Sequence, residues 1–299
     1  MASFQNAFIR NFIKSTKRMF FNPGMPVEQY RKGMEKMTGM AKMPDGVKAE
    51  KINCDGIPAE WLIPANLQNS GVVLYLHGGG YAMGSINTHR ALMSRIAVAS
   101  KTKVFGIEYR LAPENPFPCA IDDAFKAYNW LLQQGFDNSK IVIAGDSAGG
   151  GLTAALLIRI RDENAPRPSA GVCLSPWLDL AITGETALTL AAEDPMIDLA
   201  SVKSFAMYYA TKEQHLHPWV SPLYADLTGL PPVYIQVSTS EILLDDTRRF
   251  AEKAKTAGVD IQVDYWEKMV HVWQAFGSYL PEALEAIQKL GAYIEKKTA

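Results

Sequence analysis

The chain has 299 residues, 48% of them hydrophobic and 20% charged, so it can bury a sizeable core and does not have the composition of a disordered protein. Thirty basic residues against 31 acidic ones give a formal net charge of -1, without the basic surface that nucleic-acid binding requires. We therefore expect a folded protein and exclude nucleic acid as a partner.

The N-terminal segment, residues 1–21, carries Phe4, Phe8 and Phe12 at helical spacing with basic residues between them. It has neither the uninterrupted apolar run nor the small-residue cleavage site of a signal peptide. We interpret it as an amphipathic helix that packs on its own protein, with contact at a membrane surface as the alternative. Because no stretch reaches the roughly 18 apolar residues of a membrane span, we expect no stable membrane insertion.

The three cysteines, Cys54, Cys119 and Cys173, are odd in number, far apart and embedded in apolar surroundings. This pattern favours reduced thiols in the core over a disulfide framework or a metal site. It indicates a cytoplasmic protein, because thiols stay reduced in the cytosol.

Strands and helices alternate from about residue 71 to the end of the chain. Apolar, β-rich runs predict strands over Gly71–His77, Lys103–Tyr109, Lys140–Asp146, Ala170–Ser175, Pro232–Ser238 and Asp260–Trp266. Apolar stripes predict helices over Ala120–Gln134, Ala148–Asp162, Leu244–Ala257 and about Val272 to Lys296. The alternation predicts an α/β protein with a mostly parallel central sheet covered by helices on both faces.

Four segments lie outside this alternation. The runs Val47–Asn53 and Pro58–Ile63 indicate an antiparallel hairpin at the edge of the sheet. Residues 1–45 and about 178–217 fit neither pattern. We expect these last two segments to form a cap.

The segment Gly145–Gly149 reads Gly-Asp-Ser-Ala-Gly and matches G-x-S-x-G between a predicted strand and a predicted helix. A serine in this context lies on a sharp, strained turn, which needs small neighbours where the backbone crowds itself. The N-terminus of the following helix stabilises developing negative charge. Ser147 is therefore the candidate nucleophile.

A glycine-rich loop, His77-Gly78-Gly79-Gly80-Tyr81, follows the first long strand. The α/β-hydrolase fold carries an oxyanion loop at this place. Glycines let the backbone approach a substrate closely and point N–H groups into the site. We assign the oxyanion hole to the backbone N–H groups of Gly79, Gly80 and Ala148. A phosphate-binding loop is disfavoured, because no Lys-Ser/Thr pair follows.

A serine hydroxyl needs a base within hydrogen-bond reach, and the chain has five histidines. The chain order of this fold is serine, acid, histidine, which leaves His215, His217 and His271. Only His271 follows the last predicted strand, so we assign it as the base. His215 and His217 have no cluster of Cys, Asp or Glu beside them, which favours a surface or cap role over a metal site.

The acid that orients the imidazole must follow a strand between Ser147 and His271. Glu241 and Asp245 both follow the predicted strand Pro232–Ser238 and compete for this role. Glu241 lies nearer the strand end, whereas Asp245 has the position of a first-turn acid in the next helix, where the helix dipole favours it. We favour Glu241.

These motifs resemble the hormone-sensitive-lipase family of esterases, also called bacterial family IV. The resemblance runs from about Gly71 to Phe276 and rests on HGGGYAMGS, EYRLAPENPFPCAIDD, GDSAGGGL, SPWLDL, SPLYADLTGLPP, EILLDDTRRFAEKAKTAGV and MVHVWQAF. In that family the first acid of a D/E-x-L-x-D stretch completes the triad, which here is Glu241, with Asp245 as the second acid. Many relatives carry Asp there, and Glu108 likewise stands where Asp is more usual.

The resemblance implies an α/β-hydrolase fold with a catalytic domain over residues 46–177 and 218–299. Residues 1–45 and an insertion over 178–217 would form a helical cap that bounds the acyl and alcohol pockets. Family members generally hydrolyse short- to medium-chain acyl esters, need no cofactor and often dimerise. We therefore expect a small-molecule ester as the substrate, and a homodimer as a state that the family allows.

Together these assignments predict a serine carboxylesterase. His271 would remove the Ser147 proton during attack on the ester carbonyl, Glu241 would hold the imidazole, and water would then release the acid from an acyl-enzyme. Hydrolysis of amides, formamides or peptides on the same residues is one alternative. A non-catalytic small-molecule receptor on the same scaffold is another, against which the retained serine, histidine and acid argue.

Overall fold

The computed structural model describes residues 2–20, 24–38 and 41–299. Its centre is an eight-stranded sheet of order β1-β2-β4-β3-β5-β6-β7-β8. The strands are β1 (Val47–Cys54), β2 (Ile57–Pro64), β3 (Val72–Leu76), β4 (Lys103–Ile107), β5 (Ile141–Asp146), β6 (Ala170–Leu174), β7 (Val233–Ser238) and β8 (Ile261–Trp266). Strand β2 pairs antiparallel with β1 and β4, and the other neighbours pair in parallel. The predicted mostly parallel sheet and its antiparallel hairpin are confirmed.

Side chains of the central strands alternate between the two faces of the sheet. In β3, Val72, Leu74 and Leu76 belong to one hydrophobic cluster, whereas Val73 and Tyr75 belong to a second. All five are buried, as expected of a parallel strand that is covered on both faces. Burying each such side chain contributes about 1.5–3 kcal/mol, so these strands form a rigid base for the loops at their ends.

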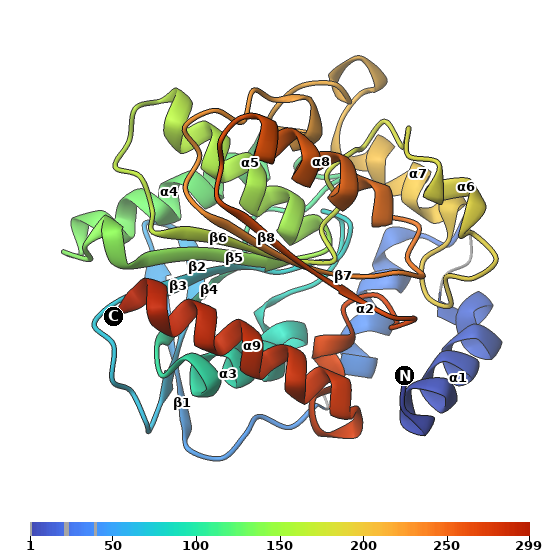
Figure 1. Cartoon of the computed structure of the whole chain (residues 1–299), viewed down its shortest axis with the longest axis horizontal. Helices are drawn as coiled ribbons and strands as arrows, with labels where there is room; N and C mark the ends of the chain where they lie inside the picture. Colours follow the sequence, from blue (N-terminus) through green and yellow to red (C-terminus); the bar gives the residue numbers. More distant parts are fainter. Residues whose placement is uncertain (1, 21–23, 39–40) are drawn as a thin grey trace.

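Helices cover both faces of the sheet (Figure 1). Helices α3 (Ile86–Ser100) and α9 (Pro281–Thr298) pack against each other on one face. Helices α4 (Cys119–Gln133), α5 (Ala148–Asp162) and α8 (Leu244–Thr256) cover the other. Helix α3 is not among the helices predicted from the sequence. That helix is buried on most of its surface, so it lacks the polar face by which a helix is recognised.

The C-terminal helix begins later than expected, at Pro281 rather than near Val272. Residues Trp273–Tyr279 form the 3-10 segment η4, in which Gly277 has φ +52° and ψ -127° and interrupts the helical path. Proline is favoured in the first helical turn, where its missing N–H group costs no hydrogen bond. The remaining 3-10 segments are η1 (Asn138–Lys140), η2 (Lys212–Gln214) and η3 (Pro222–Tyr224).

The two segments expected to form a cap gather at one end of the sheet, where α1 (Phe4–Phe20) and α2 (Val27–Thr38) lie beside α6 (Thr186–Thr189) and α7 (Leu199–Tyr209) (Figure 1). The predicted N-terminal helix is thus confirmed over residues 4–20. Residues 1 and 21 of that prediction lie outside the described residues.

One part of the expectation for α1 is wrong, because its phenylalanine stripe does not pack on the protein. Phe4, Phe8 and Phe12 are exposed by 84%, 64% and 58%. Helix α1 is held instead by Ile9 and Ile13, which pack on a small hydrophobic cluster, and by polar contacts of its other side chains.

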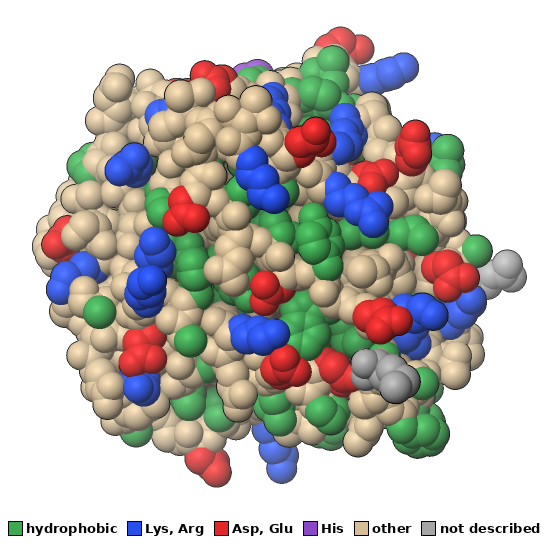
Figure 2. Space-filling view, in the orientation of Figure 1, with side chains coloured by type: hydrophobic (Ala, Val, Ile, Leu, Met, Phe, Trp, Pro, Cys, Tyr) green, Lys and Arg blue, Asp and Glu red, His purple; other side chains and the backbone are tan. Residues whose placement is uncertain are grey.

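Figure 2 shows basic and acidic side chains interspersed over the face that carries α8 and α9, in keeping with the balanced charge of the chain. Among the described residues, no helix is both long and apolar enough to cross a membrane.

Candidate active site

Ser147 occupies the turn between β5 and α5. Its backbone has φ +53° and ψ -122°, a conformation that costs a residue with a side chain about 1–3 kcal/mol. The turn packs closely on the end of β3: a Cβ atom on Gly149 would lie 2.0 Å from the Leu76 carbonyl oxygen and 2.5 Å from that of His77. Only glycine fits there, which explains the small residue two positions after the serine.

Glu241 and His271 meet at the carboxyl end of β7. Oε2 of Glu241 lies 2.5 Å from Nδ1 of His271, and both side chains are buried. The other oxygen, Oε1, accepts hydrogen bonds from the Ser238 amide at 2.8 Å and from the Ser175 hydroxyl at 2.7 Å. Asp245 points elsewhere, because its Oδ2 accepts a hydrogen bond from the Thr186 amide at 2.9 Å. The structure thus places Glu241, and not Asp245, against the histidine.

Two opposing effects act on the pKa of His271. Burial lowers it, because the charged imidazolium loses its hydration. The negative charge of Glu241 and its hydrogen bond raise it, and the charges of Asp194 and Asp146 add to this. On balance, the pKa of His271 is raised above the ordinary histidine value. The pair therefore stabilises the imidazolium that forms when the histidine takes a proton.

A short segment after β6 ties the serine turn to the acid and the base. The Ser147 amide donates to the Leu174 carbonyl at 2.8 Å, and the Trp177 amide donates to the Ser147 carbonyl at 3.0 Å. Between these two residues, the Ser175 hydroxyl donates to Glu241 and accepts a hydrogen bond at 3.3 Å from the amide of Val272, the neighbour of His271.

Among the described residues, the Ser147 hydroxyl and His271 do not form a hydrogen bond with each other. The structure thus joins acid to base directly, and joins the serine turn to both through residues 174–177 and the Ser175 hydroxyl. The sequence analysis did not single out Ser175 as a site residue. Its position in the sequence could have indicated this role, because Ser175 directly follows a buried strand, as Ser147 does, and the two strands are parallel neighbours.

The candidate oxyanion donors belong to the glycine loop after β3 and to the first residue of α5. Gly79 and Gly80 have φ +119° and +60°, and a Cβ atom on Gly79 would lie 2.2 Å from the Met83 carbonyl oxygen. Within the described part of the chain, the amide N–H groups of Gly79 and Gly80 find no acceptor. Ala148 is the first residue of α5, so its N–H also lacks a partner within the helix.

Asp146 links the glycine loop to the serine turn, a role that the sequence analysis missed. Its buried carboxylate accepts hydrogen bonds from the Tyr75 hydroxyl at 2.8 Å and the Gly78 amide at 3.1 Å, and lies 3.2 Å from Nε2 of His89. Burial raises the pKa of Asp146, but the His89 charge and these hydrogen bonds outweigh it, so that the pKa is lowered. The carboxylate holds the start of the glycine loop beside Ser147.

The other candidate histidines have local partners. Nε2 of His215 lies 3.2 Å from the Ala210 carbonyl, and Nδ1 of His217 accepts a hydrogen bond from the Trp219 amide at 3.1 Å. No group of three or more His, Cys, Asp and Glu side chains among residues 2–20, 24–38 and 41–299 is arranged to hold a metal ion. All three cysteines are free thiols, and two of them are buried.

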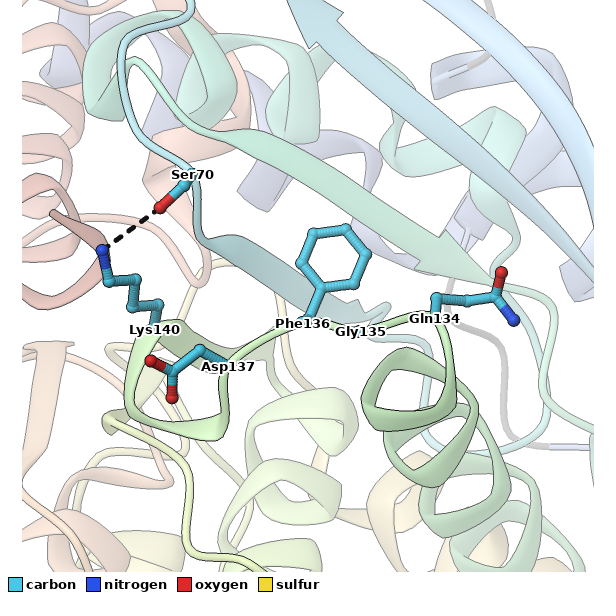
Figure 3. Close-up of a pocket in the computed structure, with 6 residues that line it drawn as sticks. All are labelled: Ser70, Gln134, Gly135, Phe136, Asp137 and Lys140. Atoms are coloured by element: carbon cyan, nitrogen blue, oxygen red, sulfur yellow. Dashed lines mark hydrogen bonds between the residues drawn. The ribbon is translucent and has the colours of Figure 1, made fainter.

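A surface hollow of about 300 Å³ lies away from these residues (Figure 3). It is lined by Ser70, Gln134, Gly135, Phe136, Asp137 and Lys140. The Lys140 ammonium donates to the Ser70 hydroxyl at 3.2 Å across it. The hollow adjoins the starts of β3 and β5, whereas Ser147 and Glu241 follow the ends of their strands. It is not part of the candidate active site.

The comparisons with known proteins agree with this fold. A family model described as the alpha/beta hydrolase fold matches residues 73–275. An acetyl-hydrolase of Streptomyces hygroscopicus is 43% identical over 240 residues, 80% of each chain. An esterase of Acinetobacter venetianus is 34% identical over 287 residues, 96% of this chain and 94% of its own. The crystal structure of an esterase from the bacterial hormone-sensitive lipase family is 42% identical, covers 100% of both chains and has a TM-score of 0.94.

The chain therefore belongs to the α/β-hydrolase fold family and, within it, to the bacterial hormone-sensitive-lipase family of esterases. The resemblance stated from the motifs is confirmed. So is the prediction of a carboxylic-ester hydrolase.

Proposed function

We propose that the protein is a serine carboxylesterase that hydrolyses short- to medium-chain acyl esters, with Ser147 as nucleophile, His271 as base and Glu241 as the acid. The contact of 2.5 Å between Glu241 and Nδ1 of His271 carries the proposal. It fixes the proton on Nδ1, which leaves Nε2 as the nitrogen that can take a proton from a serine. Ser147 stands on the matching strained turn at the same end of the sheet.

In the first half of the reaction the Ser147 oxygen attacks the ester carbonyl carbon while Nε2 of His271 takes its proton. Hydrogen bonds between nucleophile and base often tighten only when substrate is bound, so a serine and a histidine that are not yet hydrogen-bonded are compatible with this step. The N–H groups of Gly79, Gly80 and Ala148 hold the negative oxygen of the tetrahedral intermediate. Each such donor is typically worth about 3–4 kcal/mol.

In the second half the C–O bond to the leaving alcohol breaks, and His271 passes its proton to that alcohol. Water then attacks the acyl-enzyme while His271 removes one of its protons. When the bond between the acyl carbon and the Ser147 oxygen breaks, His271 returns this proton to Ser147 and the carboxylic acid leaves. Throughout, the Glu241 carboxylate stays ionised and stabilises the imidazolium.

We further propose that residues 1–45 and 178–217 form a cap over a catalytic domain of residues 46–177 and 218–299. Phe205 of α7 supports this, since its ring would lie 3.0 Å from a Cβ atom on Gly80. Its ring also meets that of Tyr30 in α2 edge to face, with centroids 5.4 Å apart. Aromatic side chains from both cap segments therefore form a wall next to the oxyanion loop, and a wall so close favours short acyl chains.

The experiment compares the wild type and Ser147→Ala on p-nitrophenyl acetate, butyrate, octanoate and palmitate. Crystals of a solved relative, EstE5, which is 40% identical with a TM-score of 0.94, were soaked with p-nitrophenyl butyrate. We expect turnover of the shorter esters by the wild type and loss of turnover in Ser147→Ala. Full activity of Ser147→Ala contradicts the proposal, and faster cleavage of butyryl p-nitroanilide than of the ester indicates an amidase. The cytoplasmic location and the homodimer stay predictions, which cell fractionation and sedimentation test.

A further inference from the structure

The guanidinium of Arg10, on the N-terminal helix α1, lies against two loops that follow β7 and β8. Its Nη1 is 2.7 Å from the Ser240 hydroxyl oxygen, 3.0 Å from the Lys268 carbonyl oxygen and 3.2 Å from that of Met269. One side chain thus bridges segments of the chain that lie more than 200 residues away from it in sequence.

These acceptors are neighbours of the proposed acid and base. Ser240 directly precedes Glu241, and Met269 lies two residues before His271. The two loops also hold each other, because the hydroxyls of Ser238 and Ser240 both donate to the Met269 carbonyl, at 2.8 and 2.9 Å. Arg10 donates to the same carbonyl. The guanidinium, the two serine hydroxyls and the Met269 carbonyl thus form one hydrogen-bonded junction between the two loops.

The second terminal nitrogen of the guanidinium contacts the segment 178–217, which also contacts the residue after Glu241. Nη2 donates to the Glu193 carbonyl at 3.1 Å. The next residue, Asp194, is buried and accepts a hydrogen bond at 3.0 Å from the amide of Ile242. Arg10 therefore restrains both neighbours of Glu241, residue 240 directly and residue 242 through the backbone next to Asp194.

We propose that Arg10 is a positioning residue for the Glu241–His271 pair, an inference that rests on the proposed function. Arginine suits this task because its planar group presents five N–H donors in a fixed fork, whereas lysine presents a single nitrogen. Arg10 does not touch the reacting atoms. Its loss loosens the contact between acid and base, which lowers kcat and leaves substrate binding, and hence KM, nearly unchanged.

Lys14 provides a matched control, one helical turn further along α1. Its ammonium donates to the Ala192 carbonyl at 3.0 Å, in the same segment that Arg10 reaches through Nη2. Within the part of the chain that the structure describes, Lys14 makes no hydrogen bond or ion pair with the loops after β7 and β8. Lys14→Met therefore removes one cation and one docking contact of α1 without touching the junction.

The experiment measures kcat and KM on p-nitrophenyl butyrate for the wild type, Arg10→Met, Arg10→Lys and Lys14→Met. Proton NMR of the same proteins follows the far-downfield resonance that a short imidazole–carboxylate hydrogen bond gives. We expect Arg10→Met to lower kcat about tenfold or more, with KM within about twofold, and to lose or shift the resonance. Arg10→Lys should restore part of kcat, and Lys14→Met should keep kcat within about twofold and keep the resonance.

Equal kcat in Arg10→Met and Lys14→Met overturns the proposal, as does a raised KM in Arg10→Met with unchanged kcat. If Arg10→Met does not fold, Arg10→Lys decides: lower kcat at unchanged KM supports the proposal, and wild-type kcat overturns it. The Ser147→Ala variant separates the two claims. Full activity in Ser147→Ala contradicts the proposed function itself, whereas full kcat in the Arg10 variants, beside an inactive Ser147→Ala, contradicts only the role of Arg10.

Discussion

Glu241 and Asp245 stand four residues apart, yet their carboxylates contact different parts of the molecule. Glu241 faces Nδ1 of His271 at 2.5 Å. Asp245, in the first turn of α8, accepts a hydrogen bond from the Thr186 amide in the segment 178–217. The first acid is therefore the candidate member of the triad, and the second joins α8 to that segment.

Glu241→Gln should separate these roles. The amide keeps the size of the side chain but presents an N–H₂ group or a neutral oxygen to His271, so the imidazolium loses its counter-charge. We expect kcat to fall by about 10²- to 10⁴-fold, since removing the charge from a triad acid has an effect of this size. Asp245→Asn is the control and should keep kcat within a few-fold. Steady-state kinetics on p-nitrophenyl butyrate decide, and the reverse pattern would move the acid to Asp245.

The pH dependence follows from the raised pKa of His271. The base must be neutral to accept a proton, so kcat/KM should rise with pH through an apparent pKa above the ordinary histidine value of about 6.5. In Glu241→Gln the counter-charge is gone, and the midpoint of this acid limb should move to lower pH. A pH series of kcat/KM tests both statements. A rate that stays flat between about pH 5 and 9 would count against His271 as the base.

Gly79→Ala should damage the oxyanion hole. At φ +119° a side chain is strained, and the added Cβ atom would lie 2.2 Å from the Met83 carbonyl, so the loop must move. We expect kcat to fall about 10²- to 10³-fold, the typical loss when one oxyanion donor is removed. The matched control is Gly135→Ala, which has φ +86° but no atom within 4 Å of the new Cβ and lies far from the site. Similar kcat values for the two variants would contradict the assignment of Gly79 as an oxyanion donor.

Asp146→Asn should weaken the fold in a pH-dependent way. The Asp146 carboxylate raises the pKa of His89 despite the burial that lowers it. The ion pair therefore stabilises the folded state fully below the unfolded histidine pKa of about 6.5, and the contribution disappears as pH rises through the raised pKa.

Urea unfolding of the wild type and Asp146→Asn at about pH 5.5 and about pH 8.5 measures this contribution. We expect a loss of about 3 kcal/mol in the variant at the lower pH and a smaller loss at the higher one. A loss that is larger at the higher pH would contradict the assignment of a charged pair.

The sequence was most informative where function depends on a short run of residues. Ser147 and Gly79 lie in motifs whose glycines are required locally, and the order of residues in the chain predicts His271 as the base. The parallel sheet followed from strands that are apolar on both faces, such as β3. The start of α9 was also available from the sequence, because Gly277 and Pro281 mark it, yet the apolar pattern alone placed it nine residues too early.

Other features depend on contacts that no local pattern encodes. Helix α3 is buried on most of its surface by the sheet and α9, and its buried residues include the polar Thr88, His89 and Ser94, so its pattern carries no clear apolar stripe. The phenylalanine stripe of α1 predicts a packed face, but those rings are exposed. The polar side chains of that helix dock it instead: Arg10 donates to the loops after β7 and β8, and Lys14 and Lys17 donate to the segment 178–217. Ser175 donates a hydrogen bond to Glu241, 66 positions further along the chain. Arg10 donates one to Ser240, 230 positions further along, and only the fold brings either pair together.

The proposed reaction requires a covalent intermediate on Ser147. The most direct measurement incubates the protein with diethyl p-nitrophenyl phosphate, which leaves a stable phosphoryl group on an activated serine, and locates the adduct by peptide mass spectrometry. We expect one equivalent of p-nitrophenol to be released and the adduct to lie on Ser147, with neither seen in Ser147→Ala. An adduct on another residue, or full labelling of Ser147→Ala, would contradict the account.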